Sequence, residues 1–508
     1  MIEKREGEGV LELALDYAKI QAQAPLFKRL IEVSERDVKG FHMPGNRGGR
    51  AFPPGFRTGW SSLETTELEA SGDVLSGSGA VAAAAARAAA FAGSAASLFI
   101  TQGSSTGLMT SLAILRHFSK RVLLPRTVHA AVIRGLALLD MEAVFLPLEE
   151  QPGQQLPQID ITNSLALIEE QKGPVCLLLT RPDYYGSVVD ITELVKALRK
   201  SGGLLAVDEA HGAHLSLGAA EFPASAISEG ADIVCQSAHK TLAALAPAAL
   251  IQIGQRAEAE FKLTELARRE LRLFHSTSPS FPIAASIDWA RAYLELYGLA
   301  QVEQLTVALT DFARALPADL KVLNPRLGAG ESELRAFDLL HLLIEFPYYA
   351  TPAHWSKLLL EAGLEAELVS FNQALFLLAP DSSRADLAEL AKRLARFSEM
   401  AKLRRPDLES QTKAQKLAKE VFSSYTELPE RGLSLRRSRL EGEVEVIDLE
   451  AASGRIVADL IAPYPPGIPL LWPGERLSPR LLRLISQCLD SGLDLLGIDQ
   501  RSLAVLKS

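Results

Sequence analysis

Residues 204–214 read LLAVDEAHGAH, an apolar run that passes directly into an aspartate, a glutamate and two histidines. The run 204–207 has the length and composition of a buried strand. Short apolar runs separated by helical patterns also occur at 98–100, 121–124, 143–146, 175–179 and 233–235. Strands that alternate with helices predict an α/β fold with a mostly parallel sheet covered by helices on both faces. Ligands of such sheets bind beyond the carboxyl ends of the strands, which is where Asp208 falls.

The chain has 508 residues, which is too long for one compact core, and its changing pattern predicts four regions. They are an N-terminal arm and loop over 1–60, a large α/β domain over 61–285, a small α+β domain over 286–400 and a C-terminal α+β domain over 401–508. Helical patterns over 9–33, 283–297 and 402–420, and a strand pattern over 442–447, fall within these regions. We expect the first of these helices to pack on a partner subunit.

The formal net charge is 53 − 62 = −9, which argues against a nucleic-acid-binding surface. The N-terminus lacks the apolar core of a signal peptide. The alanine-rich run 80–96 is short and contains Arg87, so it predicts a buried or half-buried helix rather than a membrane span. We therefore expect a cytoplasmic protein with no membrane partner.

The three cysteines, Cys176, Cys235 and Cys488, have neither paired nor metal-binding spacing. Cys176 and Cys235 lie in apolar runs, so we expect buried, reduced thiols. The sequence predicts no metal site.

An acid at the end of a strand serves two kinds of chemistry. In an ATPase it holds Mg²⁺, but that requires a phosphate loop of the form GxxxxGK[ST], and the nearest loop here, GSSTG at 103–107, has no lysine. In an enzyme that uses pyridoxal 5′-phosphate (PLP) the acid pairs with the pyridine nitrogen of the cofactor, and a lysine binds the aldehyde. Lys240, in QSAHKT at 236–241, follows the strand 233–235 and would project at the same sheet edge as Asp208. Its apolar neighbours lower the pKa of its amine.

Each of these residues alone has a simpler explanation, such as a solvated surface lysine or a histidine that caps a helix, but together they predict a PLP site. Asp208 would hold the pyridinium, and the GSSTG loop would open a helix whose amides and hydroxyls bind the phosphate. Ser237 would add a further hydroxyl, and His129 would stack on the cofactor ring.

With these motifs the chain resembles the fold-type I PLP-dependent enzymes, which have an aspartate aminotransferase-type large domain. Within them it resembles the ornithine/lysine/arginine decarboxylase family. The matching stretches are FHMPGNRGG, GSSTG, LLPRTVHAAVIRGL, RPDYYG, VDEAHGAH, QSAHKTL, STSPS and PYPPGIPLLWPGE. They follow the family order over about 41–290 and again around 440–480.

The resemblance implies that Lys240 is the Schiff-base lysine, that Asp208 is the partner of the pyridine nitrogen and that His129 stacks on the ring. It also implies that the phosphate is bound by Ser104, Ser105, Thr106 and Ser237. It further implies that Ala210 and His211 line the ring.

The resemblance also implies a homodimer or a larger homo-oligomer, because Thr277 in STSP matches a position that reaches a phosphate across a subunit boundary. Tyr464 and Glu475 are expected at the mouth of the substrate site. His239 precedes the lysine, as in the family. Either His239 or the released Lys240 would protonate the substrate Cα.

The implied reaction is decarboxylation of a basic amino acid. Arginine, lysine or ornithine would give agmatine, cadaverine or putrescine plus CO₂, with arginine and lysine the leading candidates. We expect a short form without the N-terminal wing domain. The chain departs from the family pattern at PGNR (44–47), at Asp183 before Tyr-Tyr-Gly, and at Ala238, and the first two departures bear on substrate choice and activity.

Two alternatives stay open. The first is an aminotransferase or an acyl-CoA-condensing synthase of the same fold, with an arginine such as Arg326 or Arg335 on the substrate carboxylate. The second is a catalytically inactive PLP-fold binding protein, which only the altered PGNR loop supports. STSP and PYPPGIP favour the decarboxylase over the first alternative.

Overall fold

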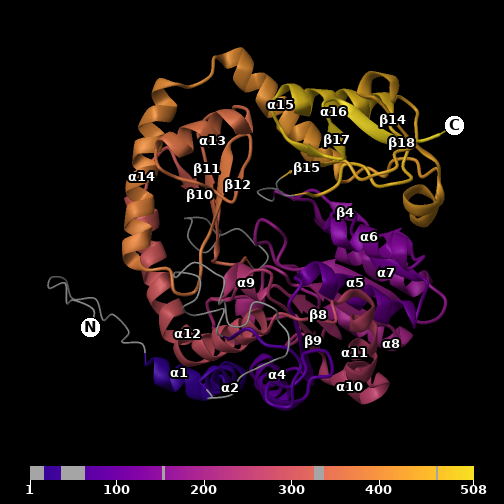
Figure 1. Cartoon of the computed structure of the whole chain (residues 1–508). Helices are drawn as coiled ribbons and strands as arrows, with labels where there is room; N and C mark the ends of the chain where they lie inside the picture. The colour runs from indigo at the N-terminus through magenta and orange to yellow at the C-terminus, as the bar shows by residue number, and fades with distance from the viewer. Residues whose placement is uncertain (1–15, 36–62, 152–154, 325–336, 465–466, 508) are drawn as a thin grey trace.

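The computed structural model describes residues 16–35, 63–151, 155–324, 337–464 and 467–507 (Figure 1). A seven-stranded sheet organises the large domain, with strand order β1-β9-β8-β7-β6-β2-β3. From β8 to β3 neighbouring strands are parallel, whereas β9 runs antiparallel to both of its neighbours. The strands are β1 (Ala96–Ile100), β2 (Arg121–Leu124), β3 (Glu142–Phe145), β6 (Cys176–Thr180), β7 (Leu204–Asp208), β8 (Ile233–Gln236) and β9 (Ala249–Ile253). The mostly parallel α/β sheet is confirmed, but the sequence analysis did not identify β9.

Both faces of this sheet are buried, and for that reason its strands read as apolar runs rather than as alternating patterns. Leu204 and Ala206 of β7 contribute to the core on one face, and Leu205 and Val207 to the core on the other. The first face is covered by α5 (Ser104–Arg116), α6 (Ala130–Leu138) and α11 (Leu263–Phe274). The second is covered by α7 (Ile161–Glu170) and α8 (Thr192–Ser201).

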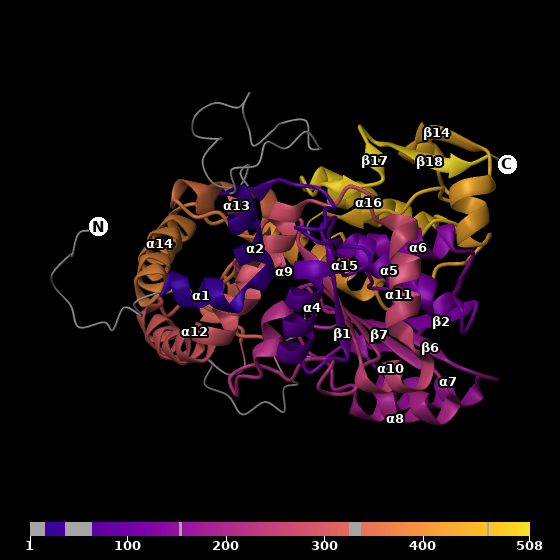
Figure 2. The same ribbon diagram turned by 60° about the horizontal axis from the view of Figure 1, so that its bottom comes forward.

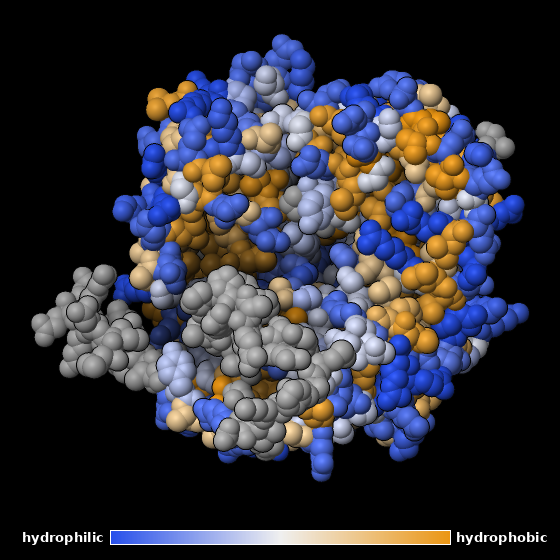
Figure 3. Space-filling view, viewed as in Figure 1, coloured by the Kyte–Doolittle hydropathy of each residue, from blue (hydrophilic) through white to orange (hydrophobic). Residues whose placement is uncertain are grey.

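The alanine-rich run forms α4 (Gly79–Ala92), which is half-buried, with one face in the core and the other exposed, and which ends before residue 96. Gly93 adopts the left-handed conformation (φ 69°) and caps the helix, and β1 begins three residues later. Among the described residues no helix has both the length and the apolarity to cross a membrane. In the space-filling view, hydrophobic patches on the coloured part of the surface are interrupted by hydrophilic side chains (Figure 3).

The helix predicted over 283–297 continues much further, as α12 (Phe281–Ala315, 35 residues). Gly298 lies within the helix and packs closely there, since a Cβ at this position would be 2.9 Å from Leu217 Cδ2. Beyond it, Val302, Leu305 and Phe312 keep the helical spacing and enter the core of the small domain. One helix therefore crosses the predicted boundary at 285/286.

The small domain contains an antiparallel sheet with strand order β10-β11-β13-β12. Its strands are β10 (Lys321–Val322), β11 (His341–Glu345), β12 (Leu368–Val369) and β13 (Gln373–Leu377). It packs with α12, α13 (Pro352–Glu361) and α14 (Arg384–Leu403) around the buried Trp355.

The described N-terminal helices, α1 (Tyr17–Gln23) and α2 (Pro25–Ser34), pack on the chain's own α12 (Figure 2). The backbone N–H of Leu26 donates to Asp288 on α12 at 2.8 Å, and Arg291 pairs with the same carboxylate. Packing of this arm on a partner subunit stays a prediction.

The C-terminal domain contains α15 (Leu408–Ser424), α16 (Pro479–Asp490) and a sheet of order β14-β18-β17. Its strands are β14 (Val444–Asp448), β17 (Ile498–Asp499) and β18 (Ser502–Leu506). The predicted helix 402–420 and strand 442–447 correspond to α15 and β14. Trp472 leaves this domain and inserts into the core of the large domain. The ring of Trp472 lies against Phe145 of β3, with ring centroids 4.9 Å apart.

Candidate active site

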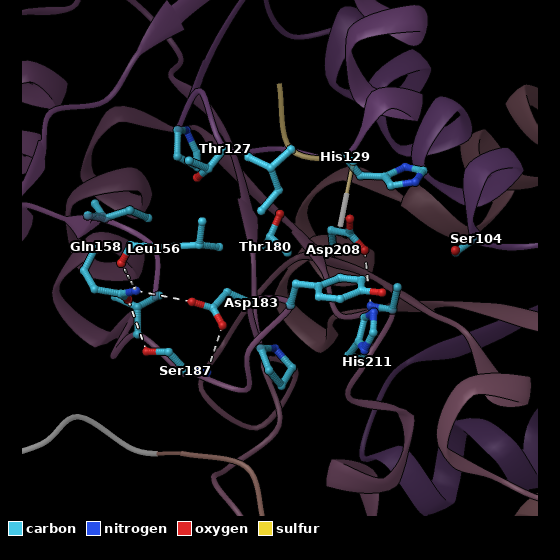
Figure 4. A pocket seen from close by; sticks show the side chains of 18 of the residues that line it. Ser104, Thr127, His129, Leu156, Gln158, Thr180, Asp183, Ser187, Asp208 and His211 are labelled. Atoms are coloured by element: carbon cyan, nitrogen blue, oxygen red, sulfur yellow. Dashed lines mark hydrogen bonds between the residues drawn. The ribbon is translucent and has the colours of Figure 1, made fainter. Parts of the chain in front are cut away.

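A cavity of about 270 Å³ lies beyond the carboxyl ends of β6 and β7 (Figure 4). Asp208 and Lys240, which are 32 positions apart, both line it. Asp208 ends β7, and Lys240 lies in the short helix α9 (Ala238–Thr241) that follows β8. Because β7 and β8 are parallel neighbours, their carboxyl ends meet at one edge. The structure thus brings the predicted acid and amine into one cavity.

The Asp208 carboxylate is 3% exposed and accepts a hydrogen bond from the Ala210 N–H at 3.2 Å. Burial raises its pKa, while the nearby His129 and Lys240 oppose that rise. A buried carboxylate with so little hydrogen bonding is stabilised by a cation placed beside it. A protonated pyridine nitrogen is such a cation.

The Lys240 side chain reaches solvent through the cavity, and its Nζ lies 3.1 Å from His211 Nε2. The protein around the amine lowers the pKa of Lys240 by desolvation, although Asp208 and Glu367 act in the opposite direction. A lower pKa increases the fraction of neutral, nucleophilic amine.

His129 also lines the cavity, and it caps α6 at the same time. Its Nδ1 accepts the Ala131 N–H at 3.2 Å, and burial lowers the pKa of the ring. The cap therefore fixes the orientation of the His129 ring, and the ring still lines the cavity.

The residues proposed for the phosphate surround the start of α5. Ser104 lines the cavity, Thr106 is buried and Ser105 is exposed. The N-cap, Gly103, has φ 82° and provides no side-chain cap for the helix amides. Ser237 Oγ is fully buried and has no hydrogen-bond partner among the described residues. An unpaired buried hydroxyl and uncapped amides at the end of a 13-residue helix fit a phosphate group.

Ala210 and His211, which the sequence suggested for the ring, both line the cavity. Tyr464 also lines the cavity, and its side chain is exposed to solvent. His239 and Thr277 are not among the described residues that line it. His239 Nδ1 contacts the Ala248 carbonyl oxygen at 2.8 Å, and Thr277 is exposed.

The structure does not place Glu475 at the substrate mouth. Glu475 is 1% exposed and forms a bidentate ion pair with Arg126, at 3.1 and 3.2 Å. The PGNR departure and the candidate arginines Arg326 and Arg335 lie outside the described residues.

Several cavity residues were not identified as site residues from the sequence. Tyr184 donates from its hydroxyl to Glu367 Oε1 at 2.6 Å, and both residues line the cavity. Asp183 accepts hydrogen bonds from the N–H groups of Tyr185 and Ser187 at 2.9 Å. The Tyr-Tyr-Gly loop after a strand could have indicated Tyr184, whereas Glu367 belongs to the small domain and has no motif around it.

A buried histidine cluster lies behind Lys240. His211 Nδ1 is 3.3 Å from His341 Nε2, and His341 Nδ1 is 2.8 Å from Asp338 Oδ2. Asp338 Oδ1 lies 3.0 Å from His214 Nε2. His214, Asp338 and His341 are completely buried.

Solved structures identify the fold of the chain. The lysine decarboxylase LdcF of Francisella novicida superposes with a TM-score of 0.79, at 19% identity, and the match covers 95% of this chain and 81% of that one. The constitutive lysine decarboxylase of E. coli superposes with a TM-score of 0.77, at 22% identity, covering 95% and 82%. These similarities establish the α/β, fold-type I architecture that the sequence predicts.

Family models identify the particular family. Residues 24–322 match the Orn/Lys/Arg decarboxylase major domain, and residues 415–490 match the Orn/Lys/Arg decarboxylase C-terminal domain. The chain belongs to the Orn/Lys/Arg decarboxylase family, whose members are PLP-dependent amino acid decarboxylases. This confirms the predicted family, and it favours the decarboxylase over the aminotransferase or synthase alternative.

Two curated relatives match this chain over nearly its whole length. The chain is 31% identical to the uncharacterized protein YaaO of Bacillus subtilis over 478 residues, covering 91% of this chain and 94% of that protein. It is 27% identical to an arginine decarboxylase of Bacillus anthracis over 500 residues, covering 97% and 98%.

Proposed function

We propose that this protein decarboxylates arginine to agmatine and CO₂, with PLP as its cofactor. The observation that carries the proposal is that the Asp208 carboxylate and the Lys240 amine face one cavity. The cavity that they share can hold the pyridine ring of PLP, whose nitrogen must be kept protonated and whose aldehyde must react with a primary amine.

Bound PLP would supply an electron sink for the carbon from which the carboxylate leaves. Asp208 would keep the pyridine nitrogen protonated. The α5 amides, with Ser104, Ser105, Thr106 and Ser237, would bind the phosphate. His129 and Ala210 would lie on the two faces of the ring, and Lys240 would provide the amine.

The cation at the far end of the substrate requires an anionic partner. Asp183 is already occupied, since it accepts two backbone N–H groups and the Gln158 side-chain amide at 3.2 Å, and these bonds shape its own loop. Glu367 is exposed to the cavity and is held in place by the Tyr184 hydroxyl. We assign the guanidinium of arginine to Glu367, because a planar guanidinium pairs well with a carboxylate.

Full-length similarity supports arginine over lysine. The arginine decarboxylase of Bacillus anthracis is covered over 98% of its length by this chain. The lysine decarboxylase LdcA of Pseudomonas aeruginosa is 24% identical and is covered over 74% of its length.

Lys240 and His211 would manage the proton at the reacting carbon. Lys240 Nζ and His211 Nε2 are 3.1 Å apart, so a proton can be held between them, next to the position where Cα must be protonated after CO₂ leaves. His239 is directed toward the Ala248 carbonyl instead, so we assign the proton to Lys240.

The proposed setting is a homodimer in a reducing, cytoplasmic compartment. Exposure of Thr277 in the single chain leaves it available to a partner subunit. The thiols of Cys176 and Cys235 are free and buried, as predicted, and so is that of Cys488, which agrees with a compartment that keeps thiols reduced.

The deciding experiment is CO₂ release measured in parallel on arginine, lysine, ornithine and a neutral amino acid. We expect release from arginine at the highest kcat/KM. Release from lysine or ornithine alone would contradict the substrate assignment. A purified protein that binds PLP but releases no CO₂ from any of them would favour the inactive binding protein.

A further inference from the structure

A chain of hydrogen bonds leads from the Lys240 amine into the interface between the large and small domains. Lys240 Nζ contacts His211 Nε2, and His211 Nδ1 contacts His341 Nε2. His341, the first residue of β11, contacts Asp338 through Nδ1. Lys240 and His211 belong to the large domain, and His341 and Asp338 belong to the small domain.

The Asp338 carboxylate sets the direction of these hydrogen bonds. Burial alone would raise its pKa, but the adjacent His214 and His341 rings hold the pKa of Asp338 well below its usual range. Asp338 is therefore an anion that only accepts, so His341 Nδ1 and His214 Nε2 donate to it. His341 Nε2 is left as an acceptor for the His211 Nδ1–H, and His211 Nε2 becomes an acceptor that faces Lys240.

We propose that His211, His341 and Asp338 form a proton relay that takes the proton of the Lys240 ammonium when its amine must act as a nucleophile. This inference rests on the proposed function, in which Lys240 reacts with the cofactor.

The proton moves from Lys240 to His211 in a first transfer, and a second transfer moves a proton from His211 to His341. One N–H bond of the ammonium breaks and an N–H bond forms at His211 Nε2. The N–H bond at His211 Nδ1 breaks and one forms at His341 Nε2. Lys240 ends as a neutral amine, His211 ends as a neutral ring with its proton on the other nitrogen, and the positive charge ends on His341.

The charge is placed on His341 because Asp338 lies beside it. Burial, together with neighbouring Lys240 and His341, lowers the pKa of His211 well below its ordinary value, so the charge does not rest on the middle ring. An imidazolium at His341 is 2.8 Å from the Asp338 carboxylate, in a site without solvent exposure. The attraction between the two charges at that distance offsets part of the cost of burying the imidazolium, and among the described residues no other ring of the relay lies so close to a carboxylate.

The carboxylates near Lys240 bear on its need for a proton acceptor. Burial lowers the pKa of Lys240, but Asp208 and Glu367 act in the opposite direction and favour the ammonium form, whose proton must leave before the amine can react. The other titratable side chains that face the relay or Lys240 are Asp183, His129, Cys235, Tyr184 and His214. Of these, His214 contacts Asp338 directly but does not lie between Lys240 and Asp338.

The loop that carries Asp183 and Tyr184 into the cavity holds the relay in position. Gly186 in this loop has φ 94°, and a Cβ there would be 2.5 Å from His341 Cβ. The Gly186 carbonyl accepts the Asp338 N–H at 2.9 Å. Only glycine permits this close approach, so the cavity loop and the relay are packed as one unit.

The test measures Lys240 itself. The full-length protein is stripped of PLP with a competing amine, desalted, and given PLP again at a series of pH values, while uptake is followed by visible absorbance. We expect Asp338→Asn and His341→Gln to shift the pH midpoint of the uptake rate upward by about one unit and to slow uptake about tenfold at pH 7. The reason is that the ammonium proton must then be lost to solvent.

The direction of the shift separates a relay from simple electrostatics. Removing the negative charge of Asp338 without a relay would destabilise the ammonium and shift the midpoint downward. His214→Gln is the matched control, because it removes a buried ring from the same carboxylate and leaves the relay path intact. Its midpoint should equal that of the unmodified protein. Thermal unfolding of each variant identifies a loss of uptake caused by misfolding, and if His341→Gln does not fold, Asp338→Asn decides alone.

An unchanged or lowered midpoint in Asp338→Asn would overturn the relay. If the unmodified protein takes up PLP normally, that result removes the relay and leaves the proposed function intact. If the unmodified protein takes up no PLP at any pH, the proposed function itself fails.

Discussion

Arg126 and Glu475 are 349 positions apart in the sequence and form a completely buried, bidentate ion pair. Arg126 lies between β2 and the His129 cap of α6, and Glu475 lies in the C-terminal domain. Around them, the Trp472 indole N–H donates to the Arg126 carbonyl at 3.1 Å, and Arg126 donates to the Leu470 carbonyl at 2.9 Å. The C-terminal domain therefore holds the segment that leads to His129 at the cavity wall.

Glu475→Gln should lower the free energy of unfolding by about 3 to 5 kcal/mol, because it leaves the Arg126 charge buried without its counter-charge. Chemical denaturation measures this loss. The control is Glu427→Gln, which breaks the exposed ion pair between Glu427 and Arg480 and should cost about 1 kcal/mol or less. Equal losses in the two variants would contradict a special role for the buried pair.

Lys240→Ala should abolish turnover and the yellow colour of bound PLP, while circular dichroism remains that of the folded protein. The side chain is at a cavity wall rather than in the core, so its removal leaves the packing intact. Residual turnover well above background would remove Lys240 from the mechanism.

Asp208→Asn should weaken PLP binding and lose most of the rate. An amide carries no charge to keep the pyridine nitrogen protonated, and a neutral pyridine is a poorer electron sink. Equilibrium titration with PLP and kcat at saturating cofactor measure the two effects separately. A kcat equal to that of the unmodified protein would show that Asp208 does not contact the ring nitrogen.

Glu367→Gln should raise the KM for arginine about tenfold or more, because the guanidinium loses a charge-assisted hydrogen bond. The matched control is Glu365→Gln, since Glu365 is exposed on the same segment and does not line the cavity. Initial-rate kinetics on arginine provide the comparison. If both variants keep the original KM, the guanidinium binds elsewhere.

Gel filtration should show a dimer or a larger assembly, and an active monomer would contradict a shared site. Subunit mixing provides a sharper test of Thr277. If Thr277 acts across the boundary, a mixed dimer of Lys240→Ala and Thr277→Ala subunits regains one site with unmodified PLP affinity. If Thr277 acts within its own chain, no site in the mixed dimer regains it.

The sequence predicted the positions of those site residues that directly follow strands of the large-domain sheet. Asp208 and Lys240 follow parallel neighbouring strands, so their meeting follows from the apolar runs before them. The strand β9 was not identified, because its antiparallel direction leaves no trace in a run of buried apolar residues.

Residues from other domains could not be placed in the same way. Glu367, Asp338 and His341 reach the site through long-range packing of the small domain, and no spacing within the sequence encodes that contact. Glu475 belongs to a recognisable motif, but only the structure shows that Arg126 buries it. The helix predicted over 283–297 ended one residue before Gly298, whereas α12 continues through this glycine, which packs closely against Leu217 of the large domain.

The unbroken α12 also constrains motion. At 1.5 Å of rise per residue, its 35 residues form a rod about 50 Å long. One half is embedded in the large domain, where Phe281 and Ala284 belong to the same core cluster as Ala238, and the other half is embedded in the domain that supplies Glu367 and His341. A stiff rod permits the small domain to pivot only as a whole, by flexing of the helix or of the chain on either side of it. Any such pivot would displace Glu367 and His341, the proposed substrate anchor and the proposed proton acceptor, together.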